Sequence, residues 1–327
     1  MRVLITGAGG FIGRHLVEDQ LQRSRQVTAV DLDTSGLAPS RGRPGLAIVE
    51  GDFRDRALLD RTLSDHDVCF HLASLHLQTD VDESAFWAVN VQGARQLVER
   101  CHAAGVGRFV HCSSVGVYGD VKTPPADEES QCDPDIPYER SKLAGETAVR
   151  EYAVQTGYPV VVVRPSWVYG PGCPRTTRLF RAILKGRFFY VGSGKTLRHP
   201  IFIEDFLAGL ELAASRPSSP GQVFILAGPR AVTIQELVEA IAFRLGKPAP
   251  RLRLPRVPVL LAAFAVEKAH AVLKKPSPLS RRSLKFYTGN TAFTTQRAQT
   301  VLGFKPKIEL DEGLARTGAW LQESGLI

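Results

Sequence analysis

The fold of this chain is decided near its start, where residues 2–13 have the sequence RVLITGAGGFIG. The apolar run at 2–6 predicts a short strand, and the apolar residues after the turn repeat at helical spacing as far as Leu21. A strand that enters a helix through a glycine-rich turn is the context of a dinucleotide-binding site. Glycine lacks a Cβ, so the backbone can approach a pyrophosphate, which the helix N-terminus attracts. The cofactor contacts expected from this turn are Gly7, Gly10, Phe11, Ile12 and Gly13.

A second strand, expected at residues 26–30, ends at Asp31. An acidic side chain at this point can accept hydrogen bonds from both ribose hydroxyls of a dinucleotide, and it repels a 2′-phosphate. Asp31 therefore favours NAD over NADP. Asp33 is an alternative for the same role, and Arg41 or Arg43 is able to soften the preference.

Strands alternate with helices over the first 165 residues. Further strands are expected at 46–50, 67–72, 109–112 and 160–163, and long helices at 84–104 and 138–156. This alternation predicts an α/β fold with a Rossmann-type, doubly wound parallel sheet. Ligands of such sheets bind at the carboxyl ends of the strands. Polar residues expected at these ends are Asp31, Asp52, His71, Ser113 and Ser114.

The pattern changes after residue 165. Helices are expected at 176–185, 203–214, 234–245, 259–273, 297–302 and 310–323, with one strand at Val223–Leu226 and an extended segment at Pro248–Pro258. We therefore expect a Rossmann domain at 1–165, joined by parts of 200–230. The rest of 166–327 is expected to form a smaller, mostly helical substrate-binding cap over the sheet.

Tyr138 and Lys142 stand four residues apart in the helix that follows Pro137. At this spacing both side chains project from one face. An ammonium group favours the phenolate and so lowers the pKa of a neighbouring phenol, which makes the phenol a proton-transfer group near neutral pH. Such a spacing is common among solvated residues, so the evidence for a catalytic role of Tyr138 and Lys142 comes from the rest of the chain.

Composition limits the class of protein. The chain has 327 residues, of which 44% are hydrophobic and 23% are charged, and this suits a globular enzyme. The formal charge of +8 fits anionic small molecules, and no basic arm or nucleic-acid motif indicates a nucleic-acid partner. The five cysteines include no C-x-x-C pair. We therefore expect no metal site, no disulfide framework and a reducing, cytoplasmic compartment.

Membrane insertion is not expected. The first residues lack the pattern of a secretory leader. The apolar stretch Val257–Val266 is too short to span a bilayer. A packing helix is the simplest explanation of this stretch, and a helix that lies on a membrane surface or over a hydrophobic substrate is the alternative.

Taken together, these residues resemble the extended short-chain dehydrogenase/reductase family, in its NAD-dependent epimerase/dehydratase branch. The shared motifs are Thr6-Gly7-x-x-Gly10-x-x-Gly13, Asp31, Gly51-Asp52, His71-Leu72-Ala73, Asn90 with Gly93, Ser113-Ser114-Val115-Gly116-Val117-Tyr118-Gly119, Tyr138-x-x-x-Lys142 and Arg164-Pro165-x-x-Val168-Tyr169-Gly170-Pro171. They follow one another in the family's order. The glycine spacing is also this family's own variant of the dinucleotide fingerprint.

The resemblance implies roles for individual residues. Ser114, four residues before Tyr118, matches the catalytic serine, with Ser113 as a second candidate. Tyr138 would be the acid/base, and Lys142 would hold the nicotinamide ribose and lower the tyrosine pKa. NAD would carry the hydride. Further implied cofactor contacts are Asp52 and Phe53 near the adenine, Leu72, Ala73, Ser74, Asn90, Ser113, Pro165 and Val168. A homodimer is a further expectation.

The substrate contacts expected besides Ser114 and Tyr138 are arginines. Arg198–Asp205 resembles a segment of nucleotide-sugar epimerases in which an arginine grips the nucleotide diphosphate, and Arg is suited to bidentate phosphate contacts. Arg281 or Arg282 would supply a second grip. Trp167 departs from the pattern, because many sugar enzymes carry Asn or a small residue there.

Three hypotheses follow. The first is an NAD-dependent epimerase or oxidoreductase that acts on a nucleotide sugar through a transient ketone. The second is a dehydrogenase or ketoreductase of a hydrophobic, sterol-like alcohol. The C-terminal part resembles the tail of 3β-hydroxysteroid and sterol dehydrogenases at Glu267, Pro278–Arg281, Phe293, Ala298, Leu302-Gly303-Phe304-x-Pro306 and Glu312-Gly313-Leu314, and it follows the apolar stretch Val257–Val266. The third, a non-catalytic nucleotide-sensing protein, conflicts with an intact Ser, Tyr and Lys set. A 4,6-dehydratase is disfavoured, since Val115 and Gly116 stand where those enzymes carry an Asp-Glu pair.

Overall fold

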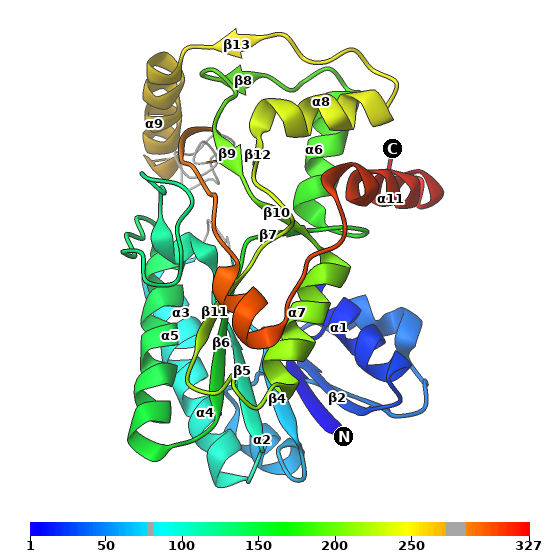
Figure 1. Cartoon of the computed structure of the whole chain (residues 1–327), viewed down its shortest axis with the longest axis vertical. Coiled ribbons are helices and arrows are strands. Elements are labelled where there is room, and N and C mark those ends of the chain that lie inside the picture. Colours follow the sequence, from blue (N-terminus) through cyan, green and yellow to red (C-terminus); the bar gives the residue numbers. More distant parts are fainter. Residues whose placement is uncertain (77–80, 273–285) are drawn as a thin grey trace.

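A seven-stranded sheet forms the centre of the molecule, and every strand in it pairs in parallel (Figure 1). The structure is a computed structural model that describes residues 1–76, 81–272 and 286–327. The strand order is β11-β6-β5-β4-β1-β2-β3. The strands are β1 (Arg2–Thr6), β2 (Gln26–Asp31), β3 (Leu46–Glu50), β4 (Val68–His71), β5 (Arg108–Cys112), β6 (Val160–Pro165) and β11 (Val223–Leu226). The direction of winding reverses between β1 and β4, and sheets of this kind bind ligands at such a point.

Helices cover both faces of the sheet, as expected for a doubly wound fold. On one face lie α1 (Phe11–Gln22) and α7 (Ile203–Ser215), with Leu16 and Phe206 in the core. On the other lie α2 (Arg56–Thr62), α4 (Ala94–Ala103) and α5 (Pro137–Thr156), with Leu97 and Val149 in the core. The buried strands β4 and β6 are apolar along most of their length because both faces are covered. The sequence-based fold class is confirmed.

The helix expected at 84–104 has an irregular middle. It consists of α3 (Glu83–Trp87), a π-helical turn η2 (Ala88–Gly93) and α4. A π turn widens the helix by one residue and is frequent at functional sites. A Cβ on Gly145 of α5 would lie 2.0 Å from the carbonyl oxygen of Asn90, so α5 packs directly on the backbone of this turn.

The second half of the chain contains both helices and short strands. Three of its helices, α6 (Pro174–Leu184), α8 (Ile234–Arg244) and α11 (Leu310–Glu323), lie in the upper part of Figure 1. Thr233 caps α8, since its Oγ1 accepts a hydrogen bond of 3.0 Å from the N–H of Glu236. Short elements of this half are β7 (Trp167–Tyr169), β8 (Tyr190–Val191), β9 (Leu197–Arg198), β10 (Pro200–Phe202), β12 (Val232–Thr233), β13 (Arg253–Leu254) and η4 (Ala298–Leu302). Two short helical turns lie in the first half, η1 (Ser35–Ser40) between β2 and β3 and η3 (Val115–Tyr118) after β5.

The segment Pro248–Pro258 is extended only in part, so that expectation is wrong at its end. Helix α9 (Arg256–Val272) begins before Pro258, which is its third residue. Proline is tolerated in the first turn of a helix because the N–H it lacks has no partner there. Within the described residues, no helix combines the length and the hydropathy needed to cross a bilayer.

Candidate active site

The glycine turn connects β1 to α1 in a conformation that excludes side chains. Gly7 has φ +74°, and a Cβ there would lie 2.5 Å from the backbone nitrogen of Ala73. A Cβ on Gly13 would lie 2.0 Å from the carbonyl oxygen of Gly7. Gly10 precedes α1 and supplies no side-chain cap. The turn therefore leaves backbone N–H groups at the N-terminus of α1 for an anion.

Asp31, at the end of β2, lies against this turn. Its carboxylate accepts a hydrogen bond of 2.8 Å from the N–H of Gly9 and one of 3.2 Å from the N–H of Asp33. The two arginines that were alternatives for modifying cofactor preference have other partners: Arg41 donates to Thr34 at 2.9 Å, and Arg43 forms an ion pair with Glu18. Asp31 is thus the carboxylate nearest the glycine turn among these candidates.

Asp52 and Phe53 follow β3. A hydrogen bond and ion pair with Arg54, at 2.6 Å, lower the pKa of the Asp52 carboxyl group. Phe53 is buried, and its ring centroid lies 5.0 Å from that of His71. A cofactor contact from Phe53 would therefore come from its backbone. That Asp52 and Phe53 contact the adenine of the cofactor remains a prediction.

Asn90 holds the segment that follows β4, which contains Leu72, Ala73 and Ser74. Its side-chain amide accepts a hydrogen bond from the N–H of Leu75 at 2.9 Å and donates to the carbonyl of Leu75 at 3.1 Å. It also donates to the hydroxyl of Ser141, on α5, at 2.9 Å. Asn90 is buried, so in this structure it positions the loop beside the glycine turn.

Lys142 lies in the interior, one turn after Tyr138 on α5. Its ammonium group donates a hydrogen bond of 2.5 Å to the carbonyl of Cys112, the last residue of β5, and only 4% of the side chain is exposed. Burial lowers the pKa of Lys142. Tyr138 is half-buried and its ring meets the ring of His76 edge-on, with the centroids 4.8 Å apart. The helix therefore carries a buried cation below an accessible phenol.

Ser114 follows β5 and begins η3. Its hydroxyl accepts a hydrogen bond of 3.0 Å from the N–H of Gly116. Gly116 lies beside Glu139, the residue that follows Tyr138, so η3 and the start of α5 are in contact. Ser113 is buried, and within the described part of the chain its hydroxyl has no hydrogen-bond partner. The structure thus brings the two serines to the same end of the sheet as Tyr138 and Lys142.

Two pairs of buried polar residues lie behind the site, and neither pair was assigned a role from the sequence: His71 with His111, and Glu146 with Arg164. Burial, with a contribution from Lys142, lowers the pKa of His71 to about 3, and burial lowers that of His111 as well. Glu146, one turn after Lys142, forms an ion pair of 2.6 Å with Arg164 of β6, and both side chains are buried. One indication of the Glu146–Arg164 ion pair was present in the sequence: Glu146 stands four residues after Lys142, so it lies on the same inward side of the helix.

An arginine–aromatic cluster, formed by Trp167, Arg175, Arg198 and Phe286, lies on segments that follow β6. Arg198 is buried and donates hydrogen bonds to the carbonyls of Gly289 and Phe286. Burial and the nearby Arg175 lower the pKa of Arg198 to about 9. Arg175 is exposed and stacks on Trp167 and Phe286, 5.1 and 5.2 Å from the ring centroids. The sequence reasoning missed Arg175, and the predicted second grip, Arg281 or Arg282, lies outside the described residues.

Comparison with known proteins decides the family. Residues 3–227 match the model of the NAD dependent epimerase/dehydratase family. The chain belongs to this family. The match covers the glycine turn, Asp31, both serines, Tyr138 and Lys142, and it ends just beyond β11.

Relatives within and near this family act on more than one class of substrate. A UDP-glucose 4-epimerase of Mycolicibacterium smegmatis is 32% identical, over 97% of this chain and 97% of its own. A sterol-4-alpha-carboxylate 3-dehydrogenase of Schizosaccharomyces pombe is 27% identical, over 98% and 97%. The structure of the dTDP-glucose 4,6-dehydratase DesIV of Streptomyces venezuelae, with NAD bound, is 27% identical with a TM-score of 0.82, over 99% and 97%.

The site fits the family's cofactor. NAD needs a turn that admits a pyrophosphate, and the close approaches at Gly7 and Gly13 leave no room for a side chain. It needs an acceptor for ribose hydroxyls, and Asp31 lies against that turn. The buried hydroxyl of Ser113 is an additional polar atom for a ligand. The protein is therefore an NAD-dependent enzyme of the extended short-chain dehydrogenase/reductase type.

Proposed function

We propose that this enzyme acts on a nucleotide sugar, and that it oxidises a ring hydroxyl to a transient ketone before reducing it again. The observation that carries the proposal is the arrangement of α5, which holds Lys142 in the interior and Tyr138 half-exposed one turn earlier. This pair lies at the same end of the sheet as Ser114.

The roles of the residues follow from their chemistry. The phenolate of Tyr138 takes the proton of the sugar hydroxyl and becomes the phenol, which returns the proton when the ketone is reduced. The Lys142 ammonium stabilises the phenolate that forms. The hydroxyl of Ser114 donates a hydrogen bond to the reacting oxygen. NAD, when bound, accepts the hydride and gives it back.

The cations of the arginine–aromatic cluster support a nucleotide diphosphate as the rest of the substrate. Arg175 is exposed, and the guanidinium carbons of Arg175 and Arg198 lie 5.2 and 4.9 Å from the ring centroid of Phe286. Two guanidinium groups close together favour a dianion such as a diphosphate. We propose that Arg175 makes the first contact and that Arg198 completes the grip, with Arg281 as a further candidate.

Epimerisation is favoured over dehydration by the composition of η3. Elimination of water from the sugar needs an acid near the reacting carbons, and Val115 and Gly116 offer none at this position. Oxidation and reduction of the same carbon need only Tyr138 and the cofactor. An epimerase or a simple oxidoreductase is therefore the better proposal, even though a dTDP-glucose 4,6-dehydratase is among the similar structures.

A hydrophobic alcohol is the second candidate substrate. The sterol dehydrogenase relative covers nearly the full chain, and the arginine–aromatic cluster also contains the rings of Trp167 and Phe286, whose centroids lie 5.8 Å apart. In that case the ketone would be released, and NAD would exchange at each turnover.

A binding titration with UDP and dTDP, followed by turnover of a panel of UDP- and dTDP-hexoses, tests the proposal. We expect NAD-loaded protein to bind a nucleotide diphosphate, with affinity lowered at least tenfold in Arg175→Ala and in Arg198→Ala. Arg178→Ala, an exposed arginine on the same helix, is the matched control and should bind as the wild type does. Absence of diphosphate binding, together with NAD reduction by sterol-like alcohols, would establish the second candidate.

Three further expectations belong to this proposal. The first is the cofactor role of Asp31: Asp31→Ala should reduce the preference for NAD over NADP, and an unchanged ratio of the two affinities would contradict that role. The second is the division into a Rossmann domain and a cap, with β11 and α7 adding to the former. The third is a homodimer in the cytoplasm, which gel filtration with light scattering and cell fractionation would test.

A further inference from the structure

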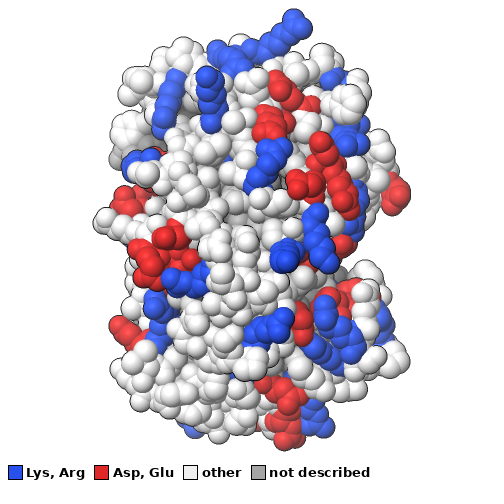
Figure 2. Space-filling view, in the orientation of Figure 1, with Lys and Arg blue, Asp and Glu red and all other residues white. Residues whose placement is uncertain are grey.

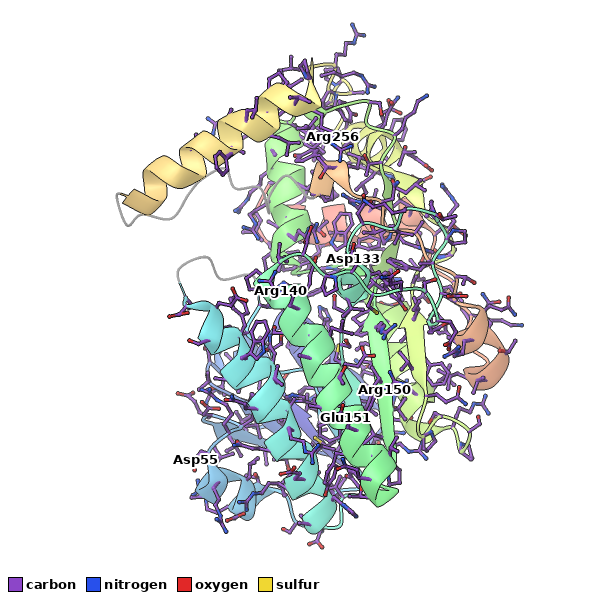
Figure 3. The ribbon with its side chains drawn as sticks, turned by 90° about the vertical axis from the view of Figure 1, so that its left-hand side faces the viewer. Asp55, Asp133, Arg140, Arg150, Glu151 and Arg256 are labelled. Carbon is purple, nitrogen blue, oxygen red and sulfur yellow. The ribbon has the colours of Figure 1, made fainter. Side chains whose placement is uncertain are left out.

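Helix α9 exposes an apolar stripe to solvent. Val257 and Leu261 are each 65% exposed and Phe264 is 42% exposed. They occupy positions i, i+4 and i+7, so their side chains lie along one side of the helix. In Figure 3 the helix projects from one edge of the molecule, with Arg256 near its base. Large apolar side chains gathered on one exposed face indicate a surface that contacts something.

The opposite side of α9 is already packed. Ala263 is buried, and with Val259 and Leu260 it contacts Val191 and Tyr287. The helix therefore has a fixed inner face and a separate outer face.

Positive charge accompanies the stripe. Arg251, Arg253 and Arg256 are exposed at or just before the start of α9, next to the exposed Leu252. The sequence of residues 251–285 contains nine Lys and Arg and one Glu, a net charge of +8, which equals the formal charge of the whole chain. Figure 2 shows blue side chains at the upper left of the molecule, where α9 lies in Figure 1. All of the excess charge thus comes from this one stretch.

We propose that the outer face of α9 docks on an anionic membrane surface. A helix that lies in the bilayer interface combines an apolar face with flanking Lys and Arg, and it binds anionic lipids through both. The arginine stems can lie along the apolar region while their charges meet lipid phosphates. Tyr287 contacts the inner face of α9, and its neighbour Phe286 contacts Arg175, so docking would bring the arginine–aromatic cluster close to the bilayer. This inference does not rest on the substrate proposed above.

Vesicle sedimentation of the full-length protein tests this surface. We expect the wild type to sediment with vesicles of phosphatidylglycerol and phosphatidylcholine, and to be released from them largely by 0.5 M NaCl, which screens the charges. Vesicles of phosphatidylcholine alone should bind it at least tenfold more weakly. Val257→Glu/Leu261→Glu should lower the partition into anionic vesicles at least tenfold, and Arg251→Glu/Arg256→Glu should do the same.

The control is Val154→Glu, in the last turn of α5, which changes an exposed apolar side chain (86% exposed) outside α9. It should bind vesicles as the wild type does, and circular dichroism together with NAD binding should show that all variants fold. A wild type that stays in the supernatant with anionic vesicles would overturn the proposal. A wild-type dimer in light scattering that Val257→Glu/Leu261→Glu converts to monomer, without vesicle binding, would instead assign the face to a second copy of this chain.

Discussion

Helices α5 and α9 contrast in what they bury. Helix α5 is rich in charged and polar residues, yet it buries Glu139, Ser141, Lys142 and Glu146. Helix α9 is the more apolar of the two, yet it exposes Val257 and Leu261. The comparison shows that composition alone does not place a helix, because neighbouring elements decide which side is covered.

The energetic difference between the two helices is large. Burial of a charge is costly unless the charge is paired and hydrogen-bonded, so each buried group of α5 needs a dedicated partner. Lys142 has the carbonyl of Cys112, and Glu146 has Arg164. Exposure of a few apolar side chains on α9 costs little by itself. Precise positions on α5 suit chemistry, whereas the open face of α9 suits contact with a surface.

The largest effect is expected from Tyr138→Phe, which tests whether α5 is a catalytic helix. Phenylalanine keeps the ring that packs on His76, so the fold should be unchanged. Loss of the hydroxyl removes the proton-transfer group, and we expect kcat to fall about 10³-fold while NAD affinity stays within a factor of two. Steady-state kinetics and a NAD titration measure both quantities. Residual activity above a tenth of the wild type would contradict the role of this tyrosine.

The second effect concerns the buried ion pair behind the site. Removal of one partner from such a pair leaves the other charge buried, so Glu146→Gln should lower the free energy of unfolding by about 3 kcal/mol. Glu151→Gln, an exposed residue on the same helix labelled in Figure 3, is the control and should change it by less than about 0.5 kcal/mol. Chemical denaturation gives both values. Equal effects would show that α5 does not depend on its buried charges.

Sequence patterns were sufficient to predict where α5 begins and ends, but not which residues its buried side chains contact. Pro137 at the first helical position and Gly157 after the last residue, with φ +70°, place the ends of this helix closely. The pairing of Glu146 with Arg164 joins a helix to a strand eighteen residues later, and no local rule encodes such a contact. The π turn at Ala88–Gly93 was invisible for the same reason, since the sequence there is compatible with an ordinary helix.

The cap shows a different limit. The expectation of an extended Pro248–Pro258 failed because Pro258 occupies the first turn of α9, where proline is permitted. Arg198 was found from a motif, but its contacts with the backbone of Phe286 and Gly289 depend on tertiary packing. The candidate site was thus predictable where one short motif supplies several groups. It was not predictable where separate elements meet.

The third effect tests how closely α5 approaches the π turn. A methyl group at Gly145 would overlap the carbonyl of Asn90, so Gly145→Ala should cost about 2 kcal/mol of unfolding free energy, although alanine is the better helix former. Gly318→Ala on α11 is the matched control, because a Cβ there meets its nearest neighbour, a ring carbon of Phe180, at 3.4 Å. That variant should be neutral or stabilised by up to about 1 kcal/mol. Thermal and chemical unfolding measure both changes. Equal unfolding free energies of the two variants would contradict the close approach of α5 to the backbone of Asn90.

The fourth effect is a pH dependence caused by the buried surroundings of Lys142. Burial lowers the pKa of His71 from 6.5 to about 3, so between these values the unfolded chain binds a proton that the folded protein does not. The stability from neutral His71 is complete above pH 6.5 and falls by about 1.4 kcal/mol per pH unit below it. In His71→Gln this part of the slope should disappear. Unfolding curves between pH 7 and 5 measure it, and an unaltered slope would assign the acid sensitivity to other groups.

The smallest change in unfolding free energy is expected for a charge placed on the exposed face of α9, and a charge placed on the buried face of α5 serves as the comparison. Leu261→Glu places a charge on a side chain that is 65% exposed, and glutamate and leucine have similar helix propensities. The free energy of unfolding should therefore change by less than about 0.5 kcal/mol. The matched change on α5 is Val149→Glu, which forces a carboxylate into the core and should cost several kcal/mol. If Leu261→Glu lowers the free energy of unfolding as much as Val149→Glu does, the outer face of α9 is covered in solution by another part of the protein. That result would contradict the proposal that this face docks on a membrane.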